Sequence, residues 1–251
     1  MTSSAVPAIA LAGVAKVFGG LRAVDGVSFS VMPGERRALI GPNGAGKTTL
    51  FHCITGTLKP SSGNVRLFGN DVTDAPEHAR TLLGMGRTFQ ITNVFPDLTL
   101  AENLALAIIG TKPRKWTMHR RLATYPEIRE QAQRGIAAVG LAGRADVPVK
   151  LLSYGERRQL ELALALNTNP KVLFLDEPCA GLSPSERQRL FALVRALPRD
   201  ITLIMIEHDM DVALGLADRV TVLHRGKVMA DGTPAEIQAN TQVRDVYFGN
   251  V

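Results

Sequence analysis

A glycine-rich segment between a strand-like run and a helix-like run restricts the fold of this chain more than any other feature. Residues 41–48 read GPNGAGKT, which fits the pattern G-x-x-x-x-G-K-[ST]. The apolar segment Arg37–Ile40 precedes it, and apolar residues follow at helical spacing up to an expected helix end near Gly56. In such a turn the glycines let backbone N–H groups surround phosphate oxygens at the positive end of a helix. The segment therefore predicts a nucleotide site.

The residue types in this segment have distinct expected roles towards ATP and Mg²⁺. Lys47 is expected to reach the β- and γ-phosphates, and the hydroxyl of Thr48 is expected to bind Mg²⁺. The full set of expected nucleotide-binding residues in the segment is Gly41, Pro42, Asn43, Gly44, Ala45, Gly46, Lys47, Thr48 and Thr49.

A second candidate site motif follows an apolar run. Val172–Leu175 reads as a buried strand, and Asp176 and Glu177 follow it directly. A strand of a parallel sheet delivers its last residues to the crevice where ligands bind. Asp176 is then expected to hold Mg²⁺ through water, and Glu177 to polarise the water that attacks the γ-phosphate. A strand that runs into an acidic turn without any site is the plainer alternative.

Strand-like and helix-like segments alternate over most of the chain, which predicts an α/β fold with a mainly parallel sheet. The opening third reads as strands, and we expect an antiparallel β part there. The middle, about residues 91–152, is helix-like and reads as an inserted helical subdomain. We therefore expect a single domain of residues 1–251, with its core at residues 1–90 and 153–251.

The composition is compatible with several classes of anionic binding partner and does not single out one of them. The net charge of +6 and the pI near 9.6 suit nucleotides, nucleic acid or an anionic membrane surface. Aromatic residues make up only 5% of the chain, which argues against nucleic-acid binding by stacked rings. Cys53 and Cys179 fit neither a disulfide framework nor a metal pattern. No basic residue precedes Lys16 and no apolar run is long enough to span a bilayer, so we expect other chains to supply any membrane span.

A third motif, Leu152–Gln159, reads LSYGERRQ at the start of an expected helix. Taken alone, it could be a helix start with Ser153 as its N-cap. The motif resembles the LSGGQ signature of ABC ATPases, and it stands, as in that family, shortly before the strand that ends in Asp-Glu. The resemblance implies that Ser153 and Gly155 of one chain contact the γ-phosphate held by another chain. Tyr154 replaces a signature glycine and Glu156 the glutamine, which puts contacts at these two positions in doubt.

Four other positions resemble motifs of the same family, and the resemblance extends from about residue 9 to 249. Gln90, in GRTFQ, resembles the Q-loop glutamine, which implies a catalytic role and a contact with Mg²⁺. His208, in IEHDM, resembles the catalytic switch histidine. Phe18 lies where an aromatic ring stacks on adenine, and residues 180–183 lie where the D-loop is expected. The fold implied is a P-loop NTPase of the ABC ATPase type.

Longer stretches resemble the ATP-binding subunits of branched-chain amino acid importers, among them GRTFQ, DEPCAGLSP and the tail GTPAEI…VRDVYFG. This resemblance implies an ATPase coupled to transport, bound peripherally at the cytoplasmic face of the inner membrane. It also implies pairing with a second ATPase subunit, either identical or a sister chain, two membrane permease subunits and a periplasmic substrate-binding protein. No nucleic-acid partner is expected.

Three alternatives remain. The ATPase of lipopolysaccharide export has a similar tail and a similar ERR segment. An ABC ATPase that acts on DNA would fit the motifs and the charge, but the chain has no sustained heptads for the coiled coils usual in that class. A P-loop kinase or GTPase would leave Ser153, Gly155 and His208 without a role.

The basic stretch Lys112–Arg121 reads as a solvated loop. The alternative is that it binds lipid phosphates or a partner protein.

Overall fold

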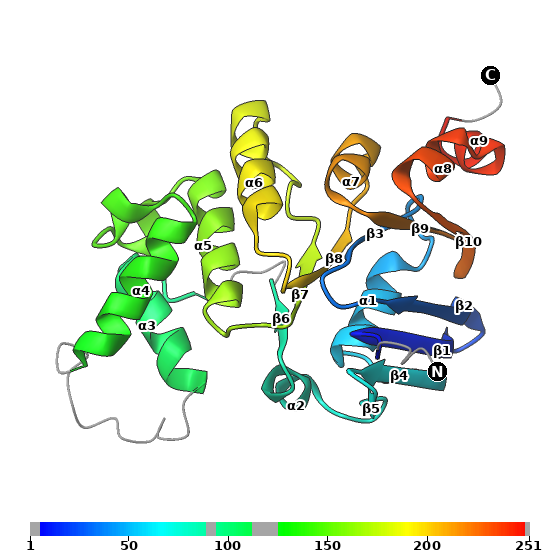
Figure 1. Cartoon of the computed structure of the whole chain (residues 1–251), viewed down its shortest axis with the longest axis horizontal. Coiled ribbons are helices and arrows are strands. Elements are labelled where there is room, and N and C mark those ends of the chain that lie inside the picture. The colour runs from blue at the N-terminus through cyan, green and yellow to red at the C-terminus, as the bar shows by residue number, and fades with distance from the viewer. Residues whose placement is uncertain (1–5, 89–93, 112–124, 249–251) are drawn as a thin grey trace, which may run out of the picture. The chain divides into compact units, whose positions relative to one another are not determined.

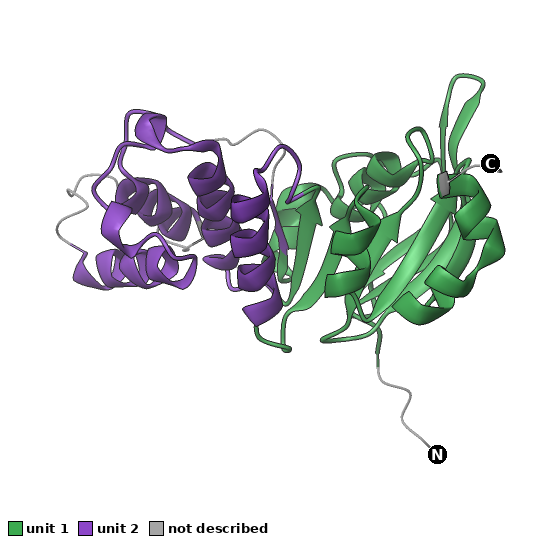
Figure 2. Cartoon of the chain, turned by 90° about the horizontal axis from the view of Figure 1, so that it is seen from above, with its two compact units in different colours: residues 1–85, 171–177, 197–251 green, residues 86–170, 178–196 purple. Residues whose placement is uncertain are grey.

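The computed structural model describes residues 6–88, 94–111 and 125–248, and the chain forms two compact units (Figure 2). Unit 1 consists of Met1–Met85, Lys171–Glu177 and Leu197–Val251, and unit 2 consists of Gly86–Pro170 and Pro178–Ala196. The expected helical subdomain of about residues 91–152 falls inside unit 2. Residues 153–170 and 178–196, which lie within the expected core of residues 153–251, also belong to unit 2, where their two helices pack on each other and the first of them packs on the helices before it.

Two sheets form the framework of unit 1 (Figure 1). The first is antiparallel, with the order β2-β1-β4-β5, and its strands are β1 (Ile9–Phe18), β2 (Leu21–Val31), β4 (Ser62–Leu67) and β5 (Asn70–Asp71). The second has the order β10-β9-β3-β8-β7-β6, and its strands are β3 (Arg36–Ile40), β6 (Met85–Arg87), β7 (Val172–Asp176), β8 (Thr202–Ile206), β9 (Arg219–His224) and β10 (Lys227–Gly232). Of β6, only Met85 belongs to unit 1. In the second sheet β9, β3, β8 and β7 are parallel, and β10 pairs antiparallel with β9. The α/β fold expected from the sequence, with a parallel core and an antiparallel β part, is confirmed.

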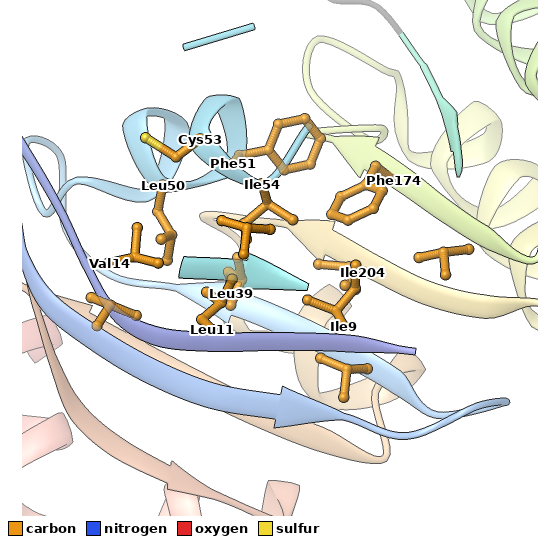
Figure 3. Packing of buried hydrophobic residues seen from close by; sticks show 14 of the residues in the cluster. Ile9, Leu11, Val14, Leu39, Leu50, Phe51, Cys53, Ile54, Phe174 and Ile204 are labelled. Carbon is orange, nitrogen blue, oxygen red and sulfur yellow. The ribbon is translucent and has the colours of Figure 1, made fainter. Parts of the chain in front are cut away.

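Helix α1 (Lys47–Thr55) packs between the two sheets and is the centre of the core of unit 1 (Figure 3). Leu50, Phe51 and Ile54 are fully buried, at the helical spacing expected from the sequence. The Phe51 ring meets Phe174 of β7 edge to face, with centroids 5.4 Å apart. The helix that follows the glycine-rich loop is therefore held by apolar contacts with both sheets.

A buried arginine binds the C-terminal end of α1. Arg80, on α2 (Glu77–Leu82), is 1% exposed, and its guanidinium donates to the carbonyls of Cys53 at 2.9 Å and Ile54 at 2.5 Å. It also donates to the carbonyl oxygen of Ala75 at 2.9 Å. A cation is favourable here because the last carbonyls of a helix carry partial negative charge and lack helical partners. Arg80 thus satisfies acceptors that water cannot reach.

We expect Arg80→Met to lower the free energy of unfolding by about 3 kcal/mol, because it leaves buried carbonyls without donors. Urea denaturation at neutral pH measures this change. The exposed Arg66→Met is the control and should stay within about 0.5 kcal/mol of the wild type. Equal stability of the two variants would contradict the role given to Arg80.

Unit 2 is mainly helical. Its helices are α3 (Leu100–Thr111), α4 (Pro126–Ala138), α5 (Tyr154–Leu166) and α6 (Pro184–Ala196), with short 3₁₀ helices at Ala142–Arg144 and Val149–Leu151. Helix α4 buries Ile128, Ala132 and Ile136, four residues apart, which is the spacing of one helix face. Helix α5 packs on α3, α4 and α6.

Among the described helices, four begin with the same capping box. In each, a Ser or Thr hydroxyl accepts a hydrogen bond from the backbone amide of a Glu three residues later, and the carboxylate of that Glu accepts one from the backbone amide of the Ser or Thr. The pairs are Thr99 and Glu102 before α3, Ser153 and Glu156 before α5, Ser183 and Glu186 before α6, and Thr233 and Glu236 before α8 (Pro234–Ala239). The remaining helices of unit 1 are α7 (Met210–Leu216), α8 (Pro234–Ala239) and α9 (Thr241–Phe248). None of the helices in the described ranges is long and apolar enough to cross a membrane.

Candidate functional site

Three neighbouring parallel strands bring the acidic motif and the glycine-rich loop to one edge of the second sheet. Strand β8 lies between β3 and β7, and its Ile206 is in register with Leu39 on one side and Asp176 on the other. The loop that begins at Gly41, the carboxylate of Glu177 and His208 all follow within two residues of this row. The register therefore gathers these residues beyond the carboxyl ends of the strands, which is where ligand sites lie in parallel sheets.

The glycine-rich loop packs tightly against neighbouring backbone. Gly46 has φ 97°, and a Cβ placed there would lie 2.3 Å from the carbonyl oxygen of Ala23. A Cβ at Gly41 would lie 2.2 Å from the carbonyl oxygen of Leu223. Backbone can approach this closely only where no side chain intervenes. Glycine is therefore required at both positions of the loop, which lies directly before the start of α1.

A hairpin turn that the sequence analysis does not identify supports the loop. Gly226, in the turn between β9 and β10, donates its amide to the carbonyl of Ala45 at 2.9 Å and accepts from the amide of Asp25 at 2.8 Å. Arg225 and Gly226 have φ 49° and 79°, as expected for a two-residue hairpin turn. Glycine in a hairpin turn is recognisable in the sequence, but its contact with a loop near the other end of the chain is not.

Lys47, the first residue of α1, is positioned by the loop itself. Its Nζ donates to the carbonyls of Gly41 at 2.6 Å and Pro42 at 3.1 Å, and the side chain is 7% exposed. Burial lowers the pKa of Lys47, and the carboxylate of Glu177 acts in the opposite direction. Thr48 and Thr49 follow in the first turn of α1 and are half-buried.

The two carboxylates at the end of β7 have different surroundings. Asp176 is 2% exposed, whereas the side chain of Glu177 is 31% exposed. Glu177 has φ 46°, which is uncommon for a residue other than glycine, and its amide donates to the carbonyl of Ile206 at 3.0 Å. Its Oε2 lies 3.8 Å from Nδ1 of His208. The positive φ turns the chain directly after the strand, so that Glu177 meets His208 while Asp176 stays buried.

Phe18 lies at the end of β1 in unit 1 and is 45% exposed. The Nζ of Lys16 lies 5.2 Å from the centroid of its ring and donates to the carbonyl of Lys59 at 2.7 Å. A cation beside a ring is favourable, and the exposed ring is the feature that the adenine role needs.

Tyr247, on α9, is a second residue near the loop that sequence analysis does not identify. Burial raises the pKa of the Tyr247 hydroxyl to about 12. The backbone of Gly41, which faces this hydroxyl, lowers the pKa but does not offset the effect of burial. No sequence pattern indicates this contact, because it joins the C-terminal helix to a loop at the end of β3.

Ser153 and Gly155 lie in unit 2, whereas the other described site residues lie in unit 1. Ser153 is the N-cap of α5, and its hydroxyl accepts from the amide of Glu156 at 3.2 Å. Glu156 accepts in return from the Ser153 amide at 2.8 Å and pairs with Arg144 at 2.8 Å. The glutamate at the place of the signature glutamine is thus part of the helix cap.

Tyr154 connects the signature motif to the segment after β7. Its hydroxyl donates to the carbonyl of Ala180 at 3.2 Å, and its ring lies against Gly181. The guanidinium of Arg158 stacks over the ring and donates to the hydroxyl at 2.8 Å. The tyrosine at the place of a signature glycine therefore has a structural role within unit 2. Gln90 and the basic stretch Lys112–Arg121 lie outside the described residues.

Comparisons with known proteins agree with this geometry. A family model for the ABC transporter matches residues 24–180, and one for the branched-chain amino acid ATP-binding cassette transporter matches residues 227–251. The chain is 36% identical to the high-affinity branched-chain amino acid transport ATP-binding protein BraF of Pseudomonas aeruginosa, over 97% of this chain and 98% of that protein. It is 37% identical to the corresponding protein LivG of Salmonella typhimurium, with the same coverage. The chain belongs to the ATP-binding proteins of ABC transporters.

Solved structures of other cassettes share the fold of this one. A crystal structure of the ADP conformation of an ATP-binding cassette of an ABC transporter aligns with a TM-score of 0.85 at 32% identity, over 97% of this chain and 99% of that one. A dimeric post-hydrolysis state of another cassette, bound to ADP and Pi, aligns with a TM-score of 0.76 at 25% identity, over 90% and 98%. This cassette is an ATPase, and the kinase and GTPase alternatives are excluded.

The described residues of the cassette suit ATP and Mg²⁺. Backbone amides at the start of α1 and the ammonium of Lys47 are donors for phosphate oxygens. A hydroxyl at Thr48 and a carboxylate at Asp176 supply the hard oxygen atoms that Mg²⁺ prefers.

Proposed function

We propose that this cassette drives the import of branched-chain or other hydrophobic amino acids, as a peripheral subunit at the cytoplasmic face of the inner membrane. The observation that carries the proposal is the match of residues 227–251 to the branched-chain cassette model, together with the names of the two full-length relatives. The ATPase of lipopolysaccharide export has a similar tail. The assay must therefore distinguish amino acids from lipopolysaccharide as the transported substrate.

In the proposed mechanism, unit 1 binds ATP through backbone amides of the segment 41–49 and the Nζ of Lys47, with the ring of Phe18 against the adenine. Thr48, Asp176 and Gln90 would hold Mg²⁺, which supplies positive charge beside the β- and γ-phosphates. Glu177 accepts the proton of the attacking water, and His208, 3.8 Å from it, orients the carboxylate and the γ-phosphate.

Hydrolysis requires two chains in this proposal. Ser153 and Gly155 of one chain contact the γ-phosphate of the ATP bound to its partner, because a hydroxyl, an amide and the start of α5 are donors for an anion. The dimeric solved relative with ADP and Pi supports such pairing for a cassette of this fold. The partner is a second copy or a sister ATPase.

Unit 2 is the proposed contact with two permease subunits, through the helical region of about residues 91–152 that follows Gln90. A periplasmic binding protein would deliver the amino acid, and no nucleic acid takes part. When ATP binding brings two cassettes together, each cassette would move as a rigid body and transmit this movement to the permeases. Addition of the amino-acid-loaded binding protein to the reconstituted complex should therefore stimulate hydrolysis.

Uptake of labelled leucine, isoleucine and valine, measured in cells that lack this protein, tests the cargo. We expect uptake of at least one of them to fall, and to recover with the wild-type gene but not with the Glu177→Gln variant. Unchanged uptake of all hydrophobic amino acids together with a defect in outer-membrane lipopolysaccharide would assign the cassette to export instead. Unchanged uptake without that defect would reject the amino acid cargo and leave the ATPase in place.

A further inference from the structure

Glu186 takes part in two contacts at once. As the third residue of α6 it closes the capping box of that helix: its Oε2 accepts from the hydroxyl of Ser183 at 2.6 Å and from the Ser183 amide at 3.0 Å. This is the ordinary role of a glutamate at that position. The three other capping-box glutamates of the described helices share it.

The second contact is with the signature motif. Gly155 is buried, and a Cβ placed there would lie 2.4 Å from Oε1 of Glu186 and 2.7 Å from its Cδ. Glycine at 155 is therefore needed for the carboxylate to approach. Hydrogen bonds from the Ser183 hydroxyl and amide, with a further contribution from the Gly155 backbone amide, lower the pKa of Glu186 against the opposing effect of desolvation, so that its carboxylate is ionised at neutral pH.

The Gly155 amide belongs to the first turn of α5 and so has no acceptor inside the helix. A carboxylate is the favoured partner for such a donor, and a hydrogen bond to an ion is stronger than one to a neutral acceptor. The same amide is the proposed donor to the partner's γ-phosphate. One donor cannot serve two anions fully, and the two anions repel each other at close range.

We propose that Glu186 is a positioning residue of the two-chain ATP site, where its carboxylate holds the Gly155 amide until the partner's γ-phosphate displaces it. This proposal rests on the two-chain site described above. The carboxylate orders the signature turn in the unpaired chain and raises the ATP concentration at which two chains pair. Tyr154, bonded to Ala180, keeps the segment before α6 beside the signature turn, which sustains the contact.

Glu186→Gln tests the contact because it removes the charge and keeps an oxygen that can close the capping box. The matched control is Glu236→Gln, in the capping box of α8, where Oε2 of Glu236 accepts from the Thr233 amide at 2.7 Å. In nucleotide-free full-length protein, we expect the amide proton resonance of Gly155 to move upfield in Glu186→Gln alone. Thermal unfolding midpoints of both variants should match the wild type. An unmoved Gly155 resonance would overturn the proposal.

Pairing is measured by sedimentation velocity against ATP concentration, with Glu177→Gln as the background in every chain to prevent hydrolysis. We expect the ATP concentration for half-maximal pairing to fall about fivefold to tenfold when Glu186→Gln is added, and to stay unchanged with Glu236→Gln. A shifted Gly155 resonance with unchanged pairing would refute the displacement step and leave the two-chain site intact. Absence of ATP-dependent pairing in the background chain itself would instead overturn the two-chain site, and this proposal with it.

Discussion

The Glu177→Gln variant is expected to bind ATP as the wild type does and to hydrolyse it about 10² to 10⁴ times more slowly. Glutamine keeps the shape of the side chain but cannot accept the proton of the attacking water. The backbone at this position, with φ 46° and its amide bonded to Ile206, should be preserved because glutamine tolerates this conformation as glutamate does. The loss should therefore appear in turnover and not in ATP affinity.

Phosphate release at saturating ATP and calorimetric ATP titration separate the two effects. The matched control is Glu127→Gln on the exposed side of α4, which should retain full turnover. Trapped ATP should make the Glu177→Gln protein accumulate as a dimer, visible by size-exclusion chromatography. Wild-type turnover in this variant would show that another residue activates the water.

Lys47→Ala should weaken ATP binding about 10- to 100-fold, because it removes a charged donor to the phosphates worth about 1.5–3 kcal/mol. The structure adds a second cause. Nζ of Lys47 bonds the carbonyls of Gly41 and Pro42, so the variant also loses a brace across the loop. Loss of this brace should lower the order of the loop amides that are expected to surround the phosphates.

Calorimetric titration of ATP with Mg²⁺ present measures the change in affinity. Lys59→Ala serves as the control, since Lys59 is also in unit 1 but its side chain is 73% exposed. Its ATP affinity should equal that of the wild type. If Lys47→Ala binds ATP equally well, Lys47 does not contact the phosphates.

Local sequence was sufficient for the elements that carry the site. The helix after the glycine-rich loop and the strand before Asp176 were predicted within one or two residues, because apolar spacing and the flanking glycines specify them directly. Strand β10 and helices α8 and α9 were not predicted, because these segments lack long runs of one hydrophobic period. The grouping of residues 153–170 and 178–196 with unit 2 does not follow from periodicity, because helical periodicity reveals that a face is apolar but not which neighbour covers it.

The groups of the candidate site can be recognised in the sequence alone: a glycine-rich loop, a lysine, a hydroxyl and two carboxylates after a buried strand. Their contacts with distant parts of the chain become visible only in the folded structure. The Gly226 amide donates to the loop carbonyl of Ala45, the Arg80 guanidinium donates to the carbonyls at the end of α1, and the carboxylate of Glu186 lies against Gly155. The physical reason is that glycines, ion pairs and capping residues are common everywhere in a sequence. Their role depends on which distant backbone the fold brings within hydrogen-bond distance.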